Sequence, residues 1–118
     1  MASNYFEEKM REFTTGATRD GEEEKVDFEG HFSPVVLEAF GEYMNRCRRC
    51  PDGSYRASDN WQLGIPKDAY MKSLWRHFLD VWKEHRGVAT KAGLRDALCA
   101  MMFNTMGYLF EILREEKK

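Results

Sequence analysis

Five side chains able to bind a metal ion or to move a proton stand on segments with helical periodicity. Glu38 and Glu42 lie four residues apart, so they would share one face of a helix. His77 and Asp80 lie three residues apart on a second segment, and Asp96 stands just before a long uncharged run. Carboxylate sets without surrounding thiolates favour hard cations. We therefore expect these five residues to be ligands of Mg²⁺ or Mn²⁺, with Glu38, Glu42 and Asp96 also acting in catalysis.

Asp96 is the most informative of these residues. Residues 97–110 carry no charge, and a helix that is apolar nearly all round is buried. A carboxylate on such a helix must be paired, protonated or metal-bound. The alternative for Asp96 is a place in the first helical turn, where the helix dipole favours an acid. The alternative for Glu38 and Glu42 is a face exposed to solvent, because both would lie opposite Phe40.

A phosphorylated ligand would suit such a site, because protein-bound Mg²⁺ usually also holds substrate phosphates. Arg side chains can clamp a phosphate with paired donors, and an aromatic ring can stack on a nucleobase. Asn104 would share a helix face with Asp96, and we assign it to substrate binding. The basic and aromatic residues that stand close together in the sequence are Arg56, Trp61, Lys67, Lys72 and Arg76.

Three long helices would carry these residues, and the predicted fold class is all-α. The first would begin at Pro34 and end before the turn signal at residues 51–53. The third would run from residue 90 or 91 to residue 114, buried between other helices. The second would span residues 67–85, with an apolar stripe that we expect to face the core: Met71, Leu74, Trp75, Phe78, Val81, Trp82 and His85.

The N-terminal part differs in character from the rest. Nine acidic and four basic residues fall within the first 30, whereas the remaining 88 hold eleven acids and fourteen bases. Residues 1–33 are polar and weakly periodic, so we expect an acidic arm with at most a short helix within residues 4–14. One helical domain would follow over residues 34–118. Its weak positive charge is unlike that of proteins that bind duplex nucleic acid.

Length and hydropathy limit the classes of protein to which the chain can belong. Of the 118 residues, 42% are apolar, which is enough for one hydrophobic core. A chain of this length buries a limited share of its surface by itself, so oligomerisation would stabilise it. No uninterrupted apolar run reaches the roughly 18 residues of a membrane span, and the charged N-terminus does not resemble a secretory signal. We expect a cytoplasmic protein, in the host cytoplasm if a phage encodes it, that does not bind membranes.

The three cysteines raise a separate question. Cys47 and Cys50 form a C-x-x-C motif, which is one half of a zinc site. The second half is missing, and an odd number of cysteines in a chain without a secretory signal favours reduced thiols. We therefore prefer two free thiols near the end of a helix over a zinc-stapled structure.

Several short motifs follow one another in a recognisable order. They are KVDF at residues 25–28, SPVVLEAFGEYM at 33–44, SDNW at 58–61, LWRHFLD at 74–80 and LRDALCAMMFN at 94–104. Their order resembles that of the MazG-like superfamily of all-α nucleoside triphosphate pyrophosphohydrolases, and most of all its small phage and bacterial dATP/dGTP diphosphohydrolases. The resemblance covers about residues 19–113.

The resemblance implies a fold, an assembly and an activity. The fold would be a helical bundle that assembles as a homodimer or homotetramer. The activity would be Mg²⁺-dependent hydrolysis of a nucleoside triphosphate, here a purine such as dATP or dGTP, to a monophosphate and pyrophosphate. The matched motifs would place near the substrate Lys25, Asp27, Asn60, Trp61 and His77.

Two further segments acquire a role if this resemblance is correct. The loop over residues 51–66 is long for a compact domain, and loops of that length are often functional. We expect it to wall the nucleotide pocket, with Asn60 and Trp61 pointing inward. The N-terminal arm would close over the nucleotide, with Arg19 or Lys25 near a phosphate.

The chain departs from the superfamily pattern in both carboxylate pairs. Glu38 and Glu42 are spaced i, i+4 where the pattern has E-x-x-E, and Gly93 stands three residues before Asp96, where the E-x-x-D pattern has Glu. The His and Asp of the second helix would then have to supply the missing ligand. The alternative is a non-catalytic helical module that binds a nucleotide or a protein partner.

Overall fold

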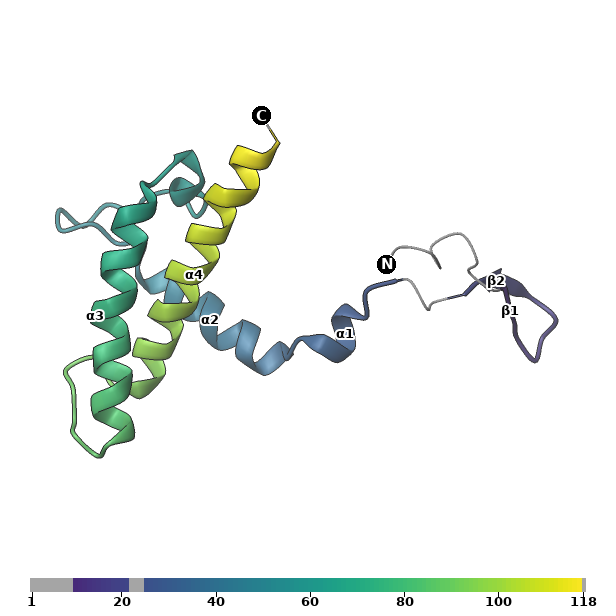
Figure 1. The fold of residues 1–118 in the computed structure, drawn as a ribbon, viewed down its shortest axis with the longest axis horizontal. Helices are drawn as coiled ribbons and strands as arrows, with labels where there is room; N and C mark the ends of the chain where they lie inside the picture. The colour runs from purple at the N-terminus through teal and green to yellow at the C-terminus, as the bar shows by residue number, and fades with distance from the viewer. Residues whose placement is uncertain (1–9, 22–24, 118) are drawn as a thin grey trace. The chain divides into compact units, whose positions relative to one another are not determined.

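The computed structural model describes residues 10–21 and 25–117, and the chain divides into two compact units, residues 1–33 and 34–118 (Figure 1). Most of the described chain is helical, as the sequence predicts. Within the described residues, no helix combines the length and the apolarity that crossing a membrane requires.

The first unit contains a β-hairpin, which corrects the expectation of a purely helical chain. Strands β1 (Met10–Glu12) and β2 (Thr18–Asp20) pair antiparallel. The turn between them closes with a hydrogen bond from the N–H of Phe13 to the carbonyl of Ala17, at 2.8 Å. Gly16 supplies the positive φ of 91° that this turn uses. A short helix within residues 4–14 is therefore wrong for residues 10–12, and residues 4–9 lie outside the described part.

The same unit ends in a single helical turn that the sequence analysis did not anticipate. Helix α1 spans Phe28–His31, and the Asp27 carboxylate accepts a hydrogen bond from the Gly30 N–H at 3.0 Å. Asp27 is thus the N-cap of α1, which satisfies one of the free N–H groups of a helix start. This structural role is separate from the substrate contact predicted for it.

The second unit is built from three long helices. Helix α2 spans Pro34–Arg46 and helix α3 spans Lys67–His85. Both the start of α2 at Pro34 and the bounds of α3 confirm the sequence prediction. A one-turn 3₁₀ helix, η1 (Asn60–Leu63), interrupts the long loop between them.

Helix α4 spans Leu94–Glu116 and begins a few residues later than predicted. Thr90 is held in the preceding loop, because its N–H and its hydroxyl both donate to the Glu84 carboxylate at 2.8 Å. These hydrogen bonds, the backbone one first, lower the pKa of Glu84. The N–H of Gly93 donates to the Thr90 hydroxyl at 3.1 Å, and Gly93 has a positive φ of 84°, so the helix can start only after it.

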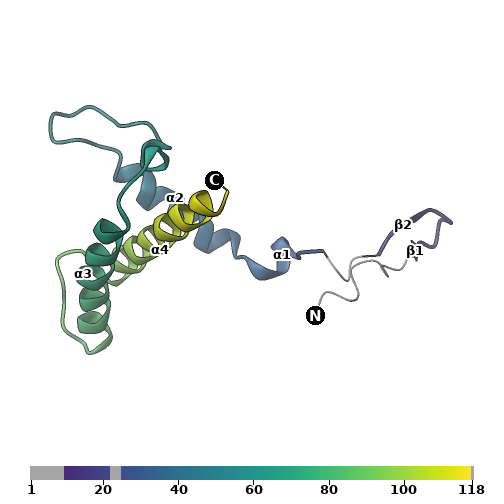
Figure 2. The same cartoon turned by 45° about the horizontal axis from the view of Figure 1, so that its top comes forward.

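Helix α4 is the central element of this unit. It packs along α3, and α2 and η1 also contact it (Figures 1 and 2). The Tyr70 ring of α3 packs directly against Gly107 of α4, whose missing Cβ leaves room for it. Tyr70 is 2% exposed, and the Cys99 thiol on the α2 side donates to the carbonyl of Ala39 at 3.9 Å.

The apolar stripe of α3, which we predicted would face the core of the protein, is largely exposed in the single chain. The predicted packing of this stripe is therefore wrong. Trp75 is 68% exposed and Phe78 is 43% exposed. Helix α3 turns Tyr70 toward α4 instead, so the helix carries two apolar faces. Helix α4 is likewise buried on one side only. The exposed residues define what we call the α3/α4 apolar face: Met71, Trp75, Phe78, Trp82, Leu94, Leu98 and Met102.

The contact between Gly107 and Tyr70 predicts opposite effects of the same substitution at two helical glycines. Gly107→Ala should destabilise the fold by about 1–3 kcal/mol, because the new methyl group would overlap the Tyr70 ring. Gly41→Ala on α2 should be neutral or stabilise by about 0.5–1 kcal/mol, because nothing lies within 4 Å of its added Cβ. Urea unfolding of both variants measures the difference, and equal effects would contradict the packing described.

Candidate ligand-binding site

A cavity of about 260 Å³ lies where α2, the long loop, α3 and α4 meet. We call it the loop pocket. Helix α3 contributes Ser73 and His77, which are spaced i, i+4 and therefore lie one turn apart on the same face. The residues that line it are Tyr43, Met44, Cys47, Arg48, Arg56, Ala57, Ser58, Asn60, Trp61, Ile65, Ser73, His77, Phe103 and Asn104.

Aromatic rings form one wall of the loop pocket. Trp61 meets Phe103 edge to face, with ring centroids 6.0 Å apart and planes at 84°. Its ring also meets Phe110 at 5.1 Å. Edge-to-face pairs are a favoured aromatic geometry. Trp61 therefore packs against two rings of α4 and is half-buried, and it also lines the cavity.

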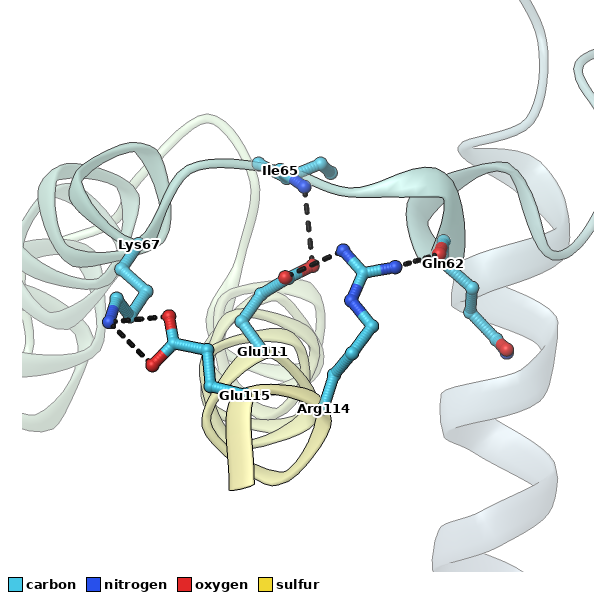
Figure 3. A network of polar contacts seen from close by, with 6 residues as sticks. All are labelled: Gln62, Ile65, Lys67, Glu111, Arg114 and Glu115. Carbon is cyan, nitrogen blue, oxygen red and sulfur yellow. Dashed lines mark hydrogen bonds and ion pairs between the residues drawn. The ribbon is translucent and has the colours of Figure 1, made fainter. Parts of the chain in front are cut away.

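The backbone around Trp61 is fixed by a group of polar contacts that we call the anchor network (Figure 3). Arg114 donates to the carbonyl of Gln62 at 2.9 Å and to the Glu111 carboxylate at 2.7 Å. The second oxygen of Glu111 accepts from the Ile65 N–H at 3.3 Å. Glu111 is only 9% exposed, so its charge needs these partners. The network holds η1 against α4 and thereby positions Trp61.

Gly64 shows how closely the anchor network fits the loop. Its φ is 128°, a conformation that side chains rarely adopt, and an added Cβ would lie 2.9 Å from the Arg114 guanidinium. The backbone conformation favours glycine here, and any side chain would also have to displace the Arg114 guanidinium. The glycine of the GIP sequence thus allows the loop to pass beside Arg114 and enter α3.

The opposite side of the loop pocket is cationic. Arg48 donates from Nε to the carbonyl of Arg56 at 2.9 Å and from Nη1 to the Asn45 side chain at 3.2 Å. Arg56 donates from Nη2 to the Cys50 sulfur at 3.9 Å. The lining residues include these two arginines and His77, and no Asp or Glu among those that the structure describes. The electrostatic character of the cavity therefore suits an anion.

Asn104 is the polar group most deeply placed in the loop pocket. It is 4% exposed, and its side-chain nitrogen donates to the Ala100 carbonyl at 2.8 Å. That bond identifies which end of the amide is nitrogen and fixes the orientation of the group. The amide oxygen remains available as an acceptor for a ligand.

Four of the predicted substrate-binding residues come together in the loop pocket. Asn60, Trp61, His77 and Asn104 all line it. The three cations predicted on α3 do not: Lys67 forms an ion pair with Glu115 at 2.9 Å, and Lys72 and Arg76 are exposed on the outside of the helix. Lys25 and Asp27 belong to the first unit.

The five predicted metal ligands do not converge in the single chain. Both oxygens of Asp96 accept hydrogen bonds from Arg46, at 3.0 and 3.1 Å, and this pairing lowers the pKa of Asp96. Glu42 lies 3.5 Å from Arg95, and Glu38 is exposed, so both glutamates lie on the outer face of α2, opposite the buried Phe40.

The donor set of one chain therefore does not fit Mg²⁺. Across residues 10–21 and 25–117, no three His, Cys, Asp or Glu side chains are grouped closely enough to hold a metal ion. His77 lines the loop pocket and Asp80 does not. The four predicted carboxylate ligands, Glu38, Glu42, Asp80 and Asp96, do not line the cavity, so we derive no chemical step through a metal.

The structure places Gly93 before α4 and not on it. The residue is the N-cap of the helix and has a positive φ of 84°. A Glu at this position would be strained, and its side chain would not lie one turn before Asp96 on the same helix. The E-x-x-D arrangement that the resemblance implies could therefore not form from these two positions in this backbone.

Sequence reasoning missed most of the cavity wall. Tyr43 and Met44 lie near the C-terminal end of α2 and Cys47 directly follows it, and the sequence analysis assigned none of the three to a ligand-binding site. No local sequence pattern marks Arg48 as a pocket residue, because its position depends on the loop that folds back beside it. Burial, followed by the hydrogen bond to Cys47, raises the pKa of Tyr43, so its hydroxyl is un-ionised at neutral pH.

The paired state of Asp96 predicts a pH-dependent coupling with Arg46. A depressed carboxyl pKa stabilises the fold above the unfolded value of about 3.9, and the contribution disappears as pH falls through the folded value. A double-mutant cycle with Arg46→Gln and Asp96→Asn should therefore show coupling at pH 7 that vanishes in acid. Thermal or urea unfolding of the four proteins measures it.

The Glu42 and Arg95 pair is the matched control for this cycle. Its side chains are 64% and 72% exposed and make a single longer contact, and exposed ion pairs contribute little. The cycle with Glu42→Gln and Arg95→Gln should show coupling close to zero at every pH. Coupling of equal size in both cycles would argue against a structural role specific to Asp96.

Comparison with known proteins finds no matching family model, no matching curated protein and no matching solved structure. The resemblance to nucleoside triphosphate pyrophosphohydrolases therefore stays a prediction from sequence.

Proposed function

We propose that the loop pocket binds a nucleoside phosphate. The observation that carries this proposal is the composition of one cavity: an aromatic wall at Trp61, a buried amide at Asn104, and two arginines with no carboxylate among the described lining residues. These are the groups that recognise a flat heteroaromatic ring and an attached anion.

The base would occupy the side of the cavity near α4. Trp61 offers a ring for stacking, and Asn104 offers a fixed carbonyl oxygen that accepts from an exocyclic amine or a ring N–H. Asn60 adds a second amide at the start of η1. A buried amide paired with a ligand discriminates strongly against ligands that leave it unpaired, so this geometry supports selectivity for particular bases.

The phosphates would lie toward Arg48 and Arg56. The Arg48 guanidinium is held in place by hydrogen bonds to the carbonyl of Arg56 and to the side chain of Asn45 on α2, which reduces the entropy lost when a ligand binds. His77 lies on the same cavity and adds a ring N–H that can donate to a phosphate oxygen. The three groups together suit a di- or triphosphate better than a neutral nucleoside.

Hydrolysis of a nucleoside triphosphate to a monophosphate and pyrophosphate is a second candidate function. It is favoured by the convergence in one cavity of four residues that the pyrophosphohydrolase motifs point to, Asn60, Trp61, His77 and Asn104. The carboxylates and the Mg²⁺ that this activity would need are not assembled by one chain. A non-catalytic nucleotide-binding module is therefore the form of the proposal that the single chain supports best.

We also propose that a second copy of the chain completes the helical bundle. The two helices present a continuous apolar surface, with a shallow hollow between them lined by Met71, Leu74, Trp75, Phe78 and Met101. Exposed apolar surface of this extent on a small domain marks an interaction site. Asp68 lies in the first turn of α3 and Lys83 in its last, so antiparallel pairing of two α3 helices would bring these unlike charges toward each other.

Nucleotide binding is tested with a panel of ribo- and deoxyribonucleoside triphosphates by calorimetry in EDTA. At least one purine triphosphate should bind. Trp61→Ala should raise its Kd about 5- to 150-fold, the equivalent of the roughly 1–3 kcal/mol of a base stacked on an aromatic ring. Arg56→Gln should weaken the triphosphate more than the nucleoside, whereas Arg76→Gln, an exposed cation outside the pocket, should change neither.

The same panel separates binding from turnover. Incubation with Mg²⁺ or Mn²⁺, followed by analysis for monophosphate and pyrophosphate, tests the second candidate. Binding without turnover leaves the nucleotide-binding proposal and rejects hydrolysis. Turnover that Glu38→Gln, Glu42→Gln or Asp96→Asn abolishes in a folded protein would instead support the enzyme. If no nucleotide saturates the protein at millimolar concentration, the proposal is wrong.

The assembly is tested by light scattering after size exclusion. The wild-type chain should run as a dimer or tetramer at micromolar concentration, and Trp75→Glu with Phe78→Glu should shift it toward monomer. Leu63→Glu is the control, because Leu63 is 83% exposed and lies outside the α3/α4 apolar face. A wild-type monomer at high concentration would contradict a second copy as the partner.

A further inference from the structure

The C-x-x-C motif lies beside the loop pocket, and neither the fold nor the proposed function accounts for it. Cys47 directly follows α2, where its N–H donates to the Tyr43 carbonyl at 3.1 Å, and its side chain lines the cavity. Cys50 is half-buried in the turn that follows. Within the described chain no third His, Cys, Asp or Glu joins them to complete a metal site.

The Cys50 sulfur has a cationic environment. Arg56 donates to it from Nη2 at 3.9 Å, and the thiol itself lies 3.8 Å from the carbonyl of Arg48. The hydrogen bond from Arg56, and after it that from Ser54, lowers the pKa of Cys50. Reactive cysteines are found in partly exposed positions next to cations, because the thiolate is the nucleophile.

The backbone between the two cysteines keeps them close in space. The N–H groups of Arg48 and Arg49 donate three residues back, at 3.3 and 3.5 Å, so the chain continues as a tight turn after α2. Cys50 then donates its N–H to Ser54 at 2.8 Å and accepts from Gly53 at 2.9 Å. Arg49 forms an isolated β-bridge with Tyr55, so the chain leaves the turn before Cys50. The two cysteines keep the two-residue spacing of C-x-x-C dithiol motifs, in which the thiols can form a disulfide.

We propose that Cys47 and Cys50 form a dithiol modification site that a hydroperoxide oxidises to an intramolecular disulfide. The Cys50 thiolate attacks one peroxide oxygen, the O–O bond breaks, and hydroxide leaves and takes up a proton, which gives a sulfenic acid. The Cys47 sulfur then attacks the Cys50 sulfur, the S–O bond breaks, and water leaves. The two sulfurs lose two electrons in total, and hydrogen peroxide is reduced to two waters.

The oxidation would alter the loop pocket, an effect that rests on the proposed function. In the reduced state the Arg56 guanidinium, which lines the cavity, donates a hydrogen bond to the Cys50 sulfur. A disulfide carries no charge and draws that sulfur toward Cys47, so it releases the Arg56 guanidinium. Oxidised protein should therefore bind a triphosphate with a several-fold lower Kd than reduced protein.

Cys99 provides the matched control within the chain. It is 6% exposed, and it packs between α4 and α2. Buried thiols in apolar surroundings are unreactive, so Cys99 should remain a free thiol under conditions that oxidise the other two.

The experiment treats the full chain with equimolar hydrogen peroxide and follows intact mass and peptide maps. The wild type and Cys99→Ser should each lose two hydrogens, with a Cys47–Cys50 bridge in the map. Cys47→Ser should instead accumulate a dimedone-reactive sulfenic acid at Cys50. Arg56→Gln should slow oxidation about threefold or more, because a smaller fraction of Cys50 would be present as the thiolate. Bridges between chains only, or reaction of Cys99 at an equal rate, would overturn the proposal.

The nucleotide arm keeps the two proposals distinct. The Kd for the best triphosphate is measured on oxidised and reduced protein, with Cys50→Ser as a protein that cannot switch. Equal affinity in both states would overturn the coupling to the pocket. A bridge that forms in a protein that binds no nucleotide at all would support the dithiol site while the proposed function failed.

Discussion

The contact between the Tyr70 ring and Gly107 is the constraint on which the second unit depends. It allows α3 and α4 to approach closely, and this approach sets His77 of α3 opposite Phe103 and Asn104 of α4 across one cavity. The Tyr70 hydroxyl is buried without a hydrogen-bond partner in the part of the chain that the structure describes, a cost that the surrounding packing must offset. Burial first, and then the nearby Glu111 carboxylate, raises the pKa of this tyrosine.

The elements with strong local signals could be predicted from the sequence. Pro34 marks the start of α2, and the periodicity of α3 fixes both of its ends. Trp61 and Asn60 could be assigned to a pocket because the loop that carries them is long and specific in order. Each of these signals acts over a few residues and does not require knowledge of distant contacts.

Other features depend on contacts that no local pattern contains. The helical periodicity of α3 does not indicate which of its two apolar faces packs against α4. The stripe with Trp75 and Phe78 was therefore predicted to lie in the core, whereas it is exposed. Asp96 was expected beside a metal because its partner Arg46 is 50 residues away in sequence. The arginines of the cavity are positioned by a loop that returns on itself, which sequence spacing does not reveal.

The positive φ of Gly93 has a further consequence, for how this chain could change over time. Because the backbone at this position favours glycine, substitution by a residue with a side chain would strain the start of α4. The entry into α4 is therefore a position at which the chain tolerates few substitutions, whatever its ancestry.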